Sequence, residues 1–346
     1  MILYDVGMKK KKLSDRQLRR IQQVQDAYAD RAARKQARAE ATLESTSLGM
    51  EQRGLVISHY GQQLDIEALE GAEAGRIFRC FQRSNLEPLV TGDIVIWQAG
   101  DPLGVVVAGI ERRSVLKRPN PFNELKPVAA NIDCIVIVIA PQPEPHYNLI
   151  DRYIVAAELM HCRPLLLLNK ADLLTDNNRA ALHDMLQLYA TLGYATLQVS
   201  SKRHDGLDKL LPLLAGNNNV FVGQSGVGKS ALVNALLPGV NTLEGELSAG
   251  EVKGRHTTTS AKLFHLPSGG NLIDSPGIRE FGLWHIAPDE LLNGFIEFRQ
   301  HLTGCRFRDC RHEREPGCQL RTAVEAALIS PQRLSSYHAI RSTLTP

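Results

Sequence analysis

A glycine-rich segment, Gly223 to Ser230, carries the clearest chemistry in the sequence. It follows a short apolar run at 220–222 and leads into a helix-like run at 231–236. In a strand–turn–helix setting, glycines let backbone N–H groups surround phosphates, and the helix N-terminus favours negative charge. Lys229 would reach the outer phosphates, and Ser230 would offer its hydroxyl to Mg²⁺. A plain glycine-rich turn is the alternative. We predict a nucleoside triphosphate site made of Gly223, Gln224, Ser225, Gly226, Val227, Gly228, Lys229 and Ser230.

Two further motifs indicate which nucleotide binds. Asn169-Lys170-Ala171-Asp172 closes a very apolar run, as expected at the end of a strand. The Asp172 carboxylate can accept both N1–H and N2–H of guanine, whereas adenine lacks that pair of donors. Asp274 and Gly277 follow another apolar run, where a carboxylate can lie near Mg²⁺ and a glycine N–H near the γ-phosphate. Three such motifs predict a Mg²⁺-dependent GTPase, with Asn169, Lys170, Asp172, Asp274 and Gly277 in its site.

The order of these motifs is unusual. In a Ras-like GTPase the phosphate loop comes first, but here Asp172 precedes Gly223 by about fifty residues. Strands can keep their places in a sheet while the chain starts elsewhere, so we predict a circular permutation. The segments that sense the γ-phosphate, between Ser230 and Gly277, then lead directly into the C-terminal region. Nucleotide state would be linked covalently to whatever that region does.

The motif order resembles that of a known family. Gly254-Arg-His-Thr-Thr-Thr259 lies between the phosphate loop and Asp274, which itself opens Asp274-Ser-Pro-Gly-Ile-Arg-Glu-Phe-Gly282. This arrangement resembles the ribosome small subunit-dependent GTPases, a circularly permuted family of subunit-assembly factors. The resemblance covers nearly the whole chain after about residue 45. It implies an N-terminal OB-fold β-barrel, a central permuted α/β P-loop GTPase and a C-terminal zinc-binding α-helical domain.

Several switch residues have roles that we expect from chemistry and from the resemblance. Ile278 stands where Ras-like enzymes carry the glutamine that orients the attacking water, so turnover without a partner should be slow. His256 is the nearest group able to accept or donate a proton at neutral pH, and the resemblance also points to it. An exposed loop histidine is the alternative. Thr258, within the run 257–259, would complete Mg²⁺ coordination, and Arg255 would serve as an arginine finger or contact RNA.

The resemblance also implies a second guanine-contacting loop. It would consist of Ser200, Ser201 and Lys202, which end a predicted strand at 195–199. A loop that merely caps the following helix explains these residues equally well.

Four ligand-type residues cluster near the C-terminus: Cys305, Cys310, His312 and Cys318. Three thiolates and one imidazole form a closed tetrahedral set for one structural Zn²⁺. The spacing departs from that of a standard zinc finger but matches the motif of the resembled family. Reduced surface thiols are the alternative. Arginines surround the ligands and suggest a phosphate-binding surface; they are Arg306, Arg308, Arg311, Arg314 and Arg321.

Composition limits the class of protein. A chain of 346 residues exceeds one typical domain, and 43% hydrophobic with 22% charged residues is ordinary for a soluble protein. The net charge of +3 requires any nucleic-acid surface to be local. The longest apolar run, 135–140, is too short to span a bilayer, and the cysteines form no secreted disulfide pattern. We therefore expect a cytoplasmic protein without a membrane partner.

The chain divides into four predicted parts: a basic arm at 1–44, an OB-fold domain at 45–117, the GTPase at 118–284 and the zinc-binding domain at 285–346. The arm is either a solvated helix or a segment that orders on RNA phosphates. Strands at 54–59, 75–81, 93–97 and 104–110 suit a small barrel. Their periodicity does not separate an OB fold from an SH3-like fold, but the resemblance selects the OB fold. Prolines at 119, 121 and 127 predict a linker.

Together these features predict a GTP hydrolase of late small-subunit maturation. It would bind the subunit and its ribosomal RNA in the GTP state, and subunit-stimulated hydrolysis would release it with GDP. The alternative hypothesis is a GTP-gated RNA-binding switch module with negligible turnover. A third hypothesis is a metal-delivering GTPase. We expect a monomer.

Overall fold

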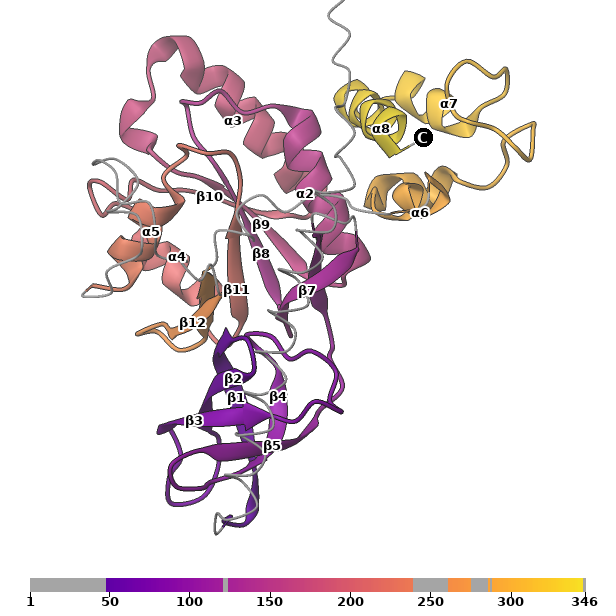
Figure 1. Ribbon diagram of the computed structural model, residues 1–346. Coiled ribbons are helices and arrows are strands. Elements are labelled where there is room, and N and C mark those ends of the chain that lie inside the picture. The colour runs from indigo at the N-terminus through magenta and orange to yellow at the C-terminus, as the bar shows by residue number, and fades with distance from the viewer. Residues whose placement is uncertain (1–47, 121–123, 239–260, 275–285, 287, 345–346) are drawn as a thin grey trace, which may run out of the picture.

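The computed structural model describes residues 48–120, 124–238, 261–274, 286 and 288–344. The predicted basic arm lies outside these ranges, as do His256, Thr258 and Gly277. Within the described part of the chain, none of the helices combines the length and hydrophobicity needed to cross a bilayer. Figure 1 shows an N-terminal barrel, a central sheet flanked by helices, and a separate C-terminal group of helices.

The N-terminal part is a closed five-stranded barrel. Its strands pair in the order β1-β2-β3-β5-β4, and β4 pairs back with β1. They are β1 (Glu51–Tyr60), β2 (Gln63–Ala68), β3 (Ile77–Gln82), β4 (Ile94–Gln98) and β5 (Gly104–Gly109). Trp97 is fully buried inside the barrel, and a Cβ on Gly54 would come within 2.6 Å of its ring. The barrel confirms the fold expected from the resemblance.

One barrel strand is absent from our sequence prediction. Strand β2 alternates between half-buried and buried residues along its whole length, which is the period-two pattern of a sheet with one face on the core. Two of its three polar residues, Asp65 and Glu67, are of types depleted in strands, which weakens the signal in the sequence.

The predicted proline linker is wrong. The chain instead forms a two-stranded hairpin of β6 (Val115–Pro119) and β7 (Leu125–Ala130). Pro127 lies opposite Lys117, next to a shift of register. A two-stranded hairpin has only edge strands, where a missing N–H costs no interior ladder bond. The domain boundary that we predicted between residues 117 and 118 therefore falls inside this hairpin.

The central domain is a mostly parallel sheet with the order β10-β9-β8-β11-β13-β12. If counting began at β11, the strand before the phosphate loop, this order would read 6-5-4-1-3-2. The sheet is therefore that of a chain whose start has moved, as predicted. Its elements are β8 (Cys134–Ile139), α2 (Tyr147–Leu159), β9 (Arg163–Leu168), a 3-10 turn η1 (Ala171–Leu173), α3 (Asp176–Thr191), β10 (Ala195–Gln198), α4 (Leu207–Leu214), β11 (Asn218–Val222), α5 (Lys229–Leu236), β12 (Lys262–His265) and β13 (Asn271–Asp274).

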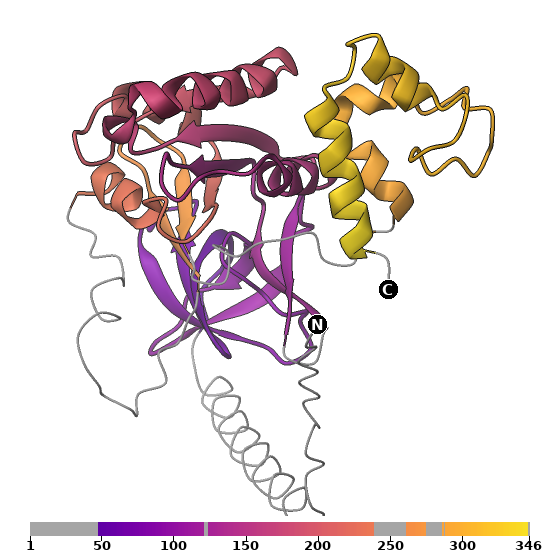
Figure 2. The ribbon, with the colours of Figure 1, turned by 90° about the horizontal axis from the view of Figure 1, so that it is seen from above.

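Helices cover both faces of this sheet, and strand β8 accordingly contributes side chains to two cores. Ile135, Ile137 and Ile139 join the core beneath α2 and α3, whereas Val136 and Val138 join the core on the side of α4 and α5. Successive side chains of a strand point to opposite faces, so a strand between two cores must be apolar throughout. Figure 2 shows the helices on the two sides of the sheet.

The C-terminal module consists of short helices that pack on α2. They are α6 (Pro288–Asn293), the 3-10 helix η2 (Ile296–His301), α7 (Gln319–Glu325) and α8 (Pro331–Leu344). The sequence favours single helices at about 288–301 and 322–341, and the structure shows both to be broken. Ala327 adopts a left-handed conformation with φ 57°, and Pro331 starts a new helix at a position that suits proline.

A buried charged cluster joins this module to the GTPase domain. Arg333 of α8 is fully buried and pairs with Asp151 of α2 and, through two hydrogen bonds, with Glu297 of η2. Tyr189 of α3 donates its hydroxyl to Asp151 at 2.6 Å. Burial opposes the charge on Arg333, but Asp151 and Glu297 raise the pKa of its guanidinium above the usual value. The cluster therefore holds a charged arginine between two carboxylates.

Replacing this arginine should destabilise the protein strongly. Arg333→Met removes the cation and leaves two buried carboxylates without a positive charge beside them, which we expect to cost about 3–5 kcal/mol of unfolding free energy. Urea denaturation followed by circular dichroism measures the loss.

The matched control is Arg299→Met at the same junction. Arg299 pairs with Glu158, but its side chain is 49% exposed. Its replacement should change the unfolding free energy by less than about 1 kcal/mol. Equal, small effects of both replacements would show that the buried cluster does not hold the module in place.

Candidate nucleotide site and Cys/His cluster

The predicted phosphate loop lies between β11 and α5, and two of its glycines are required by close contacts. Gly223 has φ 136°, and a Cβ there would meet the carbonyl oxygen of Val138 at 2.2 Å. Gly228 has φ 91°, and a Cβ there would meet Nδ2 of Asn169 at 2.5 Å. These positions combine a backbone of positive φ with the close approach of a neighbouring segment, the backbone of β8 at Gly223 and the Asn169 side chain at Gly228, and glycine suits both conditions.

Lys229 and Ser230 begin the helix that follows the loop. The ammonium of Lys229 donates to the carbonyls of Gly223 at 2.8 Å and Gln224 at 2.7 Å, so its side chain lies along the loop. Ser230 is buried beside it, whereas Ser225 and Gly226 are exposed on the rim. The first N–H groups of a helix have no partner within the helix. The loop can thus present a cation and the N-terminal end of a helix to an anion that approaches from solvent.

Asn169 connects the two halves of the site. Its side chain is fully buried, and Nδ2 donates to the carbonyl of Val227 in the phosphate loop at 3.0 Å. Its Oδ1 accepts from the backbone N–H of Ser201 at 3.1 Å. One amide therefore fixes the phosphate loop and the loop after β10 relative to each other.

The side chain of Lys170 also contacts the phosphate loop. Its ammonium donates to the carbonyls of Gly226 at 2.5 Å and Gln142 at 3.1 Å. Gln142 belongs to the loop after β8, which our sequence analysis did not include in the site. The signal was available, because this proline-rich loop follows a buried strand that runs parallel to β11. Loops at the carboxyl ends of parallel strands meet at one edge of a sheet.

Asp172 and Ser200 lie together at this edge. The Ser200 hydroxyl donates to the Asp172 carboxylate at 2.5 Å, and this bond lowers the pKa of the carboxyl. Asp172 is therefore ionised at neutral pH, and its remaining lone pairs can accept two donors from one edge of a ligand. Lys202 is exposed nearby in the sequence.

The structure brings most of the predicted nucleotide residues to one edge of the sheet. Those at 169–172, 200–202 and 223–230 follow β9, β10 and β11, which are parallel. Asp274 ends β13, the parallel neighbour of β11 on the other side. His256, Thr258 and Gly277 lie outside the described residues, so the structure does not place them.

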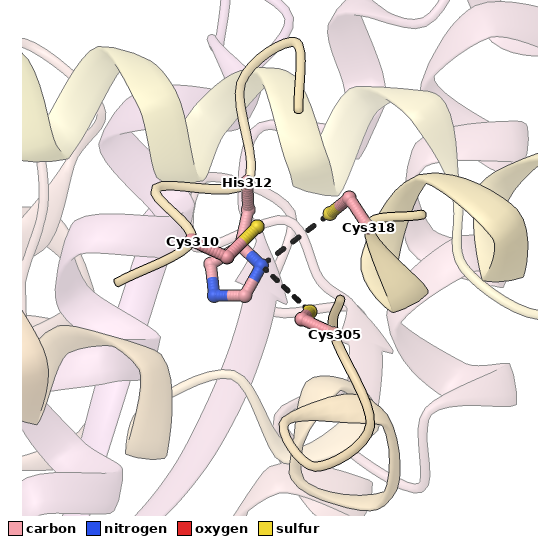
Figure 3. Close-up of side chains that lie close together, drawn as sticks. All are labelled: Cys305, Cys310, His312 and Cys318. Carbon is pink, nitrogen blue, oxygen red and sulfur yellow. Dashed lines mark hydrogen bonds between the residues drawn. The ribbon is translucent and has the colours of Figure 1, made fainter. Parts of the chain in front are cut away.

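The four predicted metal ligands come together in the C-terminal module (Figure 3). Their ligand atoms all lie within 4.8 Å of one another. Nδ1 of His312 is 3.7 Å from Sγ of Cys305 and 3.4 Å from Sγ of Cys318. A tetrahedral Zn²⁺ with ordinary bond lengths places nitrogen and sulfur ligands about 3.6 Å apart. The set therefore has the size and chemistry of a closed zinc site.

The protonation of the cluster also suits a cation. Burial lowers the pKa of His312, which keeps the imidazole in the neutral form that binds metals. Burial and the neighbouring sulfur atoms raise the pKa of the Cys310 thiol to about 12. Thiols this close resist ionisation together, and a divalent cation removes that obstacle because it binds them as thiolates.

Glu315 organises the loop that carries His312, a role that our sequence analysis missed. Its carboxylate accepts from the backbone N–H groups of Arg311 at 2.8 Å, Glu313 at 2.9 Å and Arg314 at 3.0 Å. These bonds lower the pKa of Glu315 to about 2. Glu315 is therefore charged at neutral pH and holds the loop in a conformation in which His312 has φ 61°.

Known proteins share this arrangement. Residues 109–284 match the RsgA GTPase family. The chain is 55% identical over 338 residues to the small ribosomal subunit biogenesis GTPase RsgA of Hahella chejuensis, covering 97% of each chain. The protein of the same name from Pseudomonas putida is also 55% identical, covering 97% of this chain and 98% of its own.

Solved structures agree with the sequence matches. The crystal structure of YjeQ from Thermotoga maritima superposes with a TM-score of 0.71 at 29% identity, covering 85% of this chain and 99% of that one. YloQ, described as a circularly permuted GTPase, gives a TM-score of 0.69 at 28% identity, covering 86% and 97%. Fold, phosphate loop and motif order define a circularly permuted P-loop GTPase. The chain belongs to the RsgA GTPase family.

Removing the Glu315 carboxylate should loosen the metal site. Without this acceptor the loop loses the bonds that hold His312 among the thiolates, so Glu315→Ala should speed zinc loss to a chelator about tenfold. Release is followed with a chromogenic zinc indicator after addition of the chelator. Glu325→Ala, an exposed carboxylate on α7, is the control and should release zinc like the parent. Equal release rates in all three proteins would show that Glu315 does not support the site.

Proposed function

We propose that this protein hydrolyses GTP on the maturing small ribosomal subunit and leaves the subunit after hydrolysis. The observation that carries the proposal is identity of 55% over 97% of the chain to proteins named small ribosomal subunit biogenesis GTPase. The match includes the barrel and the C-terminal module as well as the GTPase domain. The proposed location is the cytoplasm, and the proposed oligomeric state is a monomer.

In this proposal the nucleotide residues have separate tasks. Lys229 leaves its carbonyl partners to contact the outer phosphates, and the N–H groups of the loop from Gly223 to Gly228 surround them. Ser230, Asp274 and Thr258 hold Mg²⁺, and Gly277 donates to the γ-phosphate. Asp172 accepts from guanine, within a loop arrangement that Asn169 and Ser200 hold in place. The contacts of Asn169 and Asp172 described above support the assignment of Asp172 to the base.

Changing Asp172 should change the base that binds. Asp172→Asn replaces an acceptor by an amide donor, so it loses the bond to the guanine N2–H and gains one to the O2 carbonyl of xanthine. We expect the dissociation constant for GTP to rise about a hundredfold and that for XTP to fall below it. Competition against a fluorescent nucleotide measures both constants.

Asn169→Asp is the matched control, because it removes the donor to Val227 without altering the carboxylate at residue 172. It should weaken GTP and XTP binding alike. A parental preference for GTP in Asp172→Asn would contradict the assignment of Asp172 to the base.

The C-terminal module supplies a proposed RNA surface around one structural Zn²⁺. Four of the arginines beside the ligands are exposed, and Phe307 among them is 42% exposed. Arg306 lies over the ring of Phe307 at 5.7 Å. A metal-fixed loop with exposed guanidinium groups can contact RNA phosphates through several hydrogen bonds. The ligands Cys305, Cys310, His312 and Cys318 would keep this surface in one conformation.

Catalysis is proposed to depend on the subunit. Ile278 cannot orient water, so hydrolysis needs another group, and His256 is the proposed one. Binding to ribosomal RNA would bring His256 to the attacking water. Arg255 is the second candidate from the same segment.

Single-turnover GTP hydrolysis, with and without purified small subunits, tests this proposal. We expect subunits to stimulate the parent strongly, and His256→Ala to lower the stimulated rate by about 10²–10⁴-fold because proton transfer to a positioned group is lost. GTP affinity, measured separately, should stay at the parental value.

Other outcomes identify the alternatives. Stimulation that survives in His256→Ala would move the catalytic role to Arg255 or to the ribosome. Tight GTP-dependent binding to subunits without stimulation of the parent would favour a GTP-gated switch module over a hydrolase.

A further inference from the structure

The short strand β12 is held by three separate segments of the barrel. Thr91, in the loop before β4, donates its hydroxyl to the carbonyl of Ala261 at 2.8 Å. Ser58 of β1 pairs with Lys262, and this pairing joins the barrel strands and the GTPase strands into one continuous sheet. At the other end of the strand, Nε2 of His265 lies 2.6 Å from the carboxylate of Glu67 on β2.

The position of Thr91 is set by contacts other than its hydrogen bond to Ala261. It is 1% exposed, and its neighbour Gly92 donates to the carbonyl of Val56 in β1 at 2.9 Å. Gly92 has φ 93°, and a Cβ there would meet the carbonyl oxygen of Ala130 at 2.2 Å. The barrel and the β6–β7 hairpin thus determine where the Thr91 hydroxyl lies, and that hydroxyl determines where Ala261 lies.

The other edge of β12 faces β13, the strand that ends at the predicted Mg²⁺ ligand Asp274. Strand β12 pairs with β13 over its full length, and Lys262 lies opposite Asp274. Ser58 of the barrel, Lys262 of β12 and Asp274 of β13 therefore lie side by side on three adjacent strands. Adjacent strands of a sheet are about 4.8 Å apart. Ala261 also lies two residues after Gly254 to Thr259, the motif that the sequence predicts as the first switch. The barrel consequently holds a strand that adjoins both γ-phosphate-sensing motifs.

We propose that Thr91 and Glu67 are positioning residues for hydrolysis, through which the barrel sets the place of β12 and of the motifs attached to it. When RNA docks on the barrel, the contacts through Thr91 and Glu67 transmit that restraint to β12. The inference rests on the proposed function, because it explains how a subunit-bound barrel would accelerate GTP cleavage.

The test measures the hydrolysis rate on saturating small subunits, the basal rate, and the affinities for GTP and for subunits. Thr91→Val keeps the shape of the side chain but removes the donor to Ala261, and Glu67→Ala removes the contact with His265. Each should lower the stimulated rate about tenfold, because the docked barrel no longer holds β12 and its motifs in alignment, while both affinities stay parental.

Matched controls separate positioning from stability. Thr91→Ser retains the hydroxyl and should restore stimulation, and Glu51→Ala removes an exposed carboxylate at the far end of β1. Thermal unfolding of every variant is recorded. Glu67 lies at the partly exposed side of the junction, where His265 is 55% exposed, so Glu67→Ala still tests the inference if Thr91→Val fails to fold.

Parental stimulation in both Thr91→Val and Glu67→Ala would overturn the inference while leaving the proposed function intact. A loss of subunit affinity with an unchanged rate at saturation would also overturn it, because the contacts would then serve docking alone. A parent protein that subunits do not stimulate would overturn the proposed function and the inference together.

Discussion

The nucleotide site depends on one buried amide. Asn169 donates to the phosphate loop and accepts from the loop after β10, and these segments lie 58 and 32 residues away from it in the sequence. The guanine motif and the phosphate loop are distant in the sequence, so they meet only in the folded sheet. A buried amide with partners on both sides specifies a single arrangement, since any other arrangement would leave its donor or acceptor unpaired.

Two other buried polar contacts attach the accessory parts to the same sheet. The barrel reaches β12 through Thr91, and the C-terminal module reaches α2 through Arg333. Purely apolar junctions allow packed surfaces to slide, whereas buried hydrogen bonds and ion pairs lose much of their energy when displaced by one residue. Each accessory part is therefore held in register with the GTPase domain, which matters if each contacts RNA.

Local sequence predicted the parts of the structure whose chemistry is local. The phosphate loop, the Asn169–Asp172 motif and the Cys/His cluster each occupy one short segment, and their residue types admit few other uses. The barrel loop carrying Thr91, the loop after β8 and the role of Glu315 were not predicted. Arg333 reads as a surface residue in a polar helix, and its partner Asp151 lies 182 residues away. Burial of a charged side chain depends on partners that only the tertiary fold supplies.

The permutation gives these attachments a common consequence. The segments expected to sense the γ-phosphate lie between β11 and the C-terminal module, and β12 in their midst touches the barrel. In an unpermuted chain the guanine motif would follow β13, and the C-terminal module could not follow the second switch directly. Moving the chain start lets the C-terminal module follow the switch segments after residue 285, while the barrel contacts β12 between them. A surface contacted by both parts would then constrain the switch segments at two places, which a single appended domain could not do.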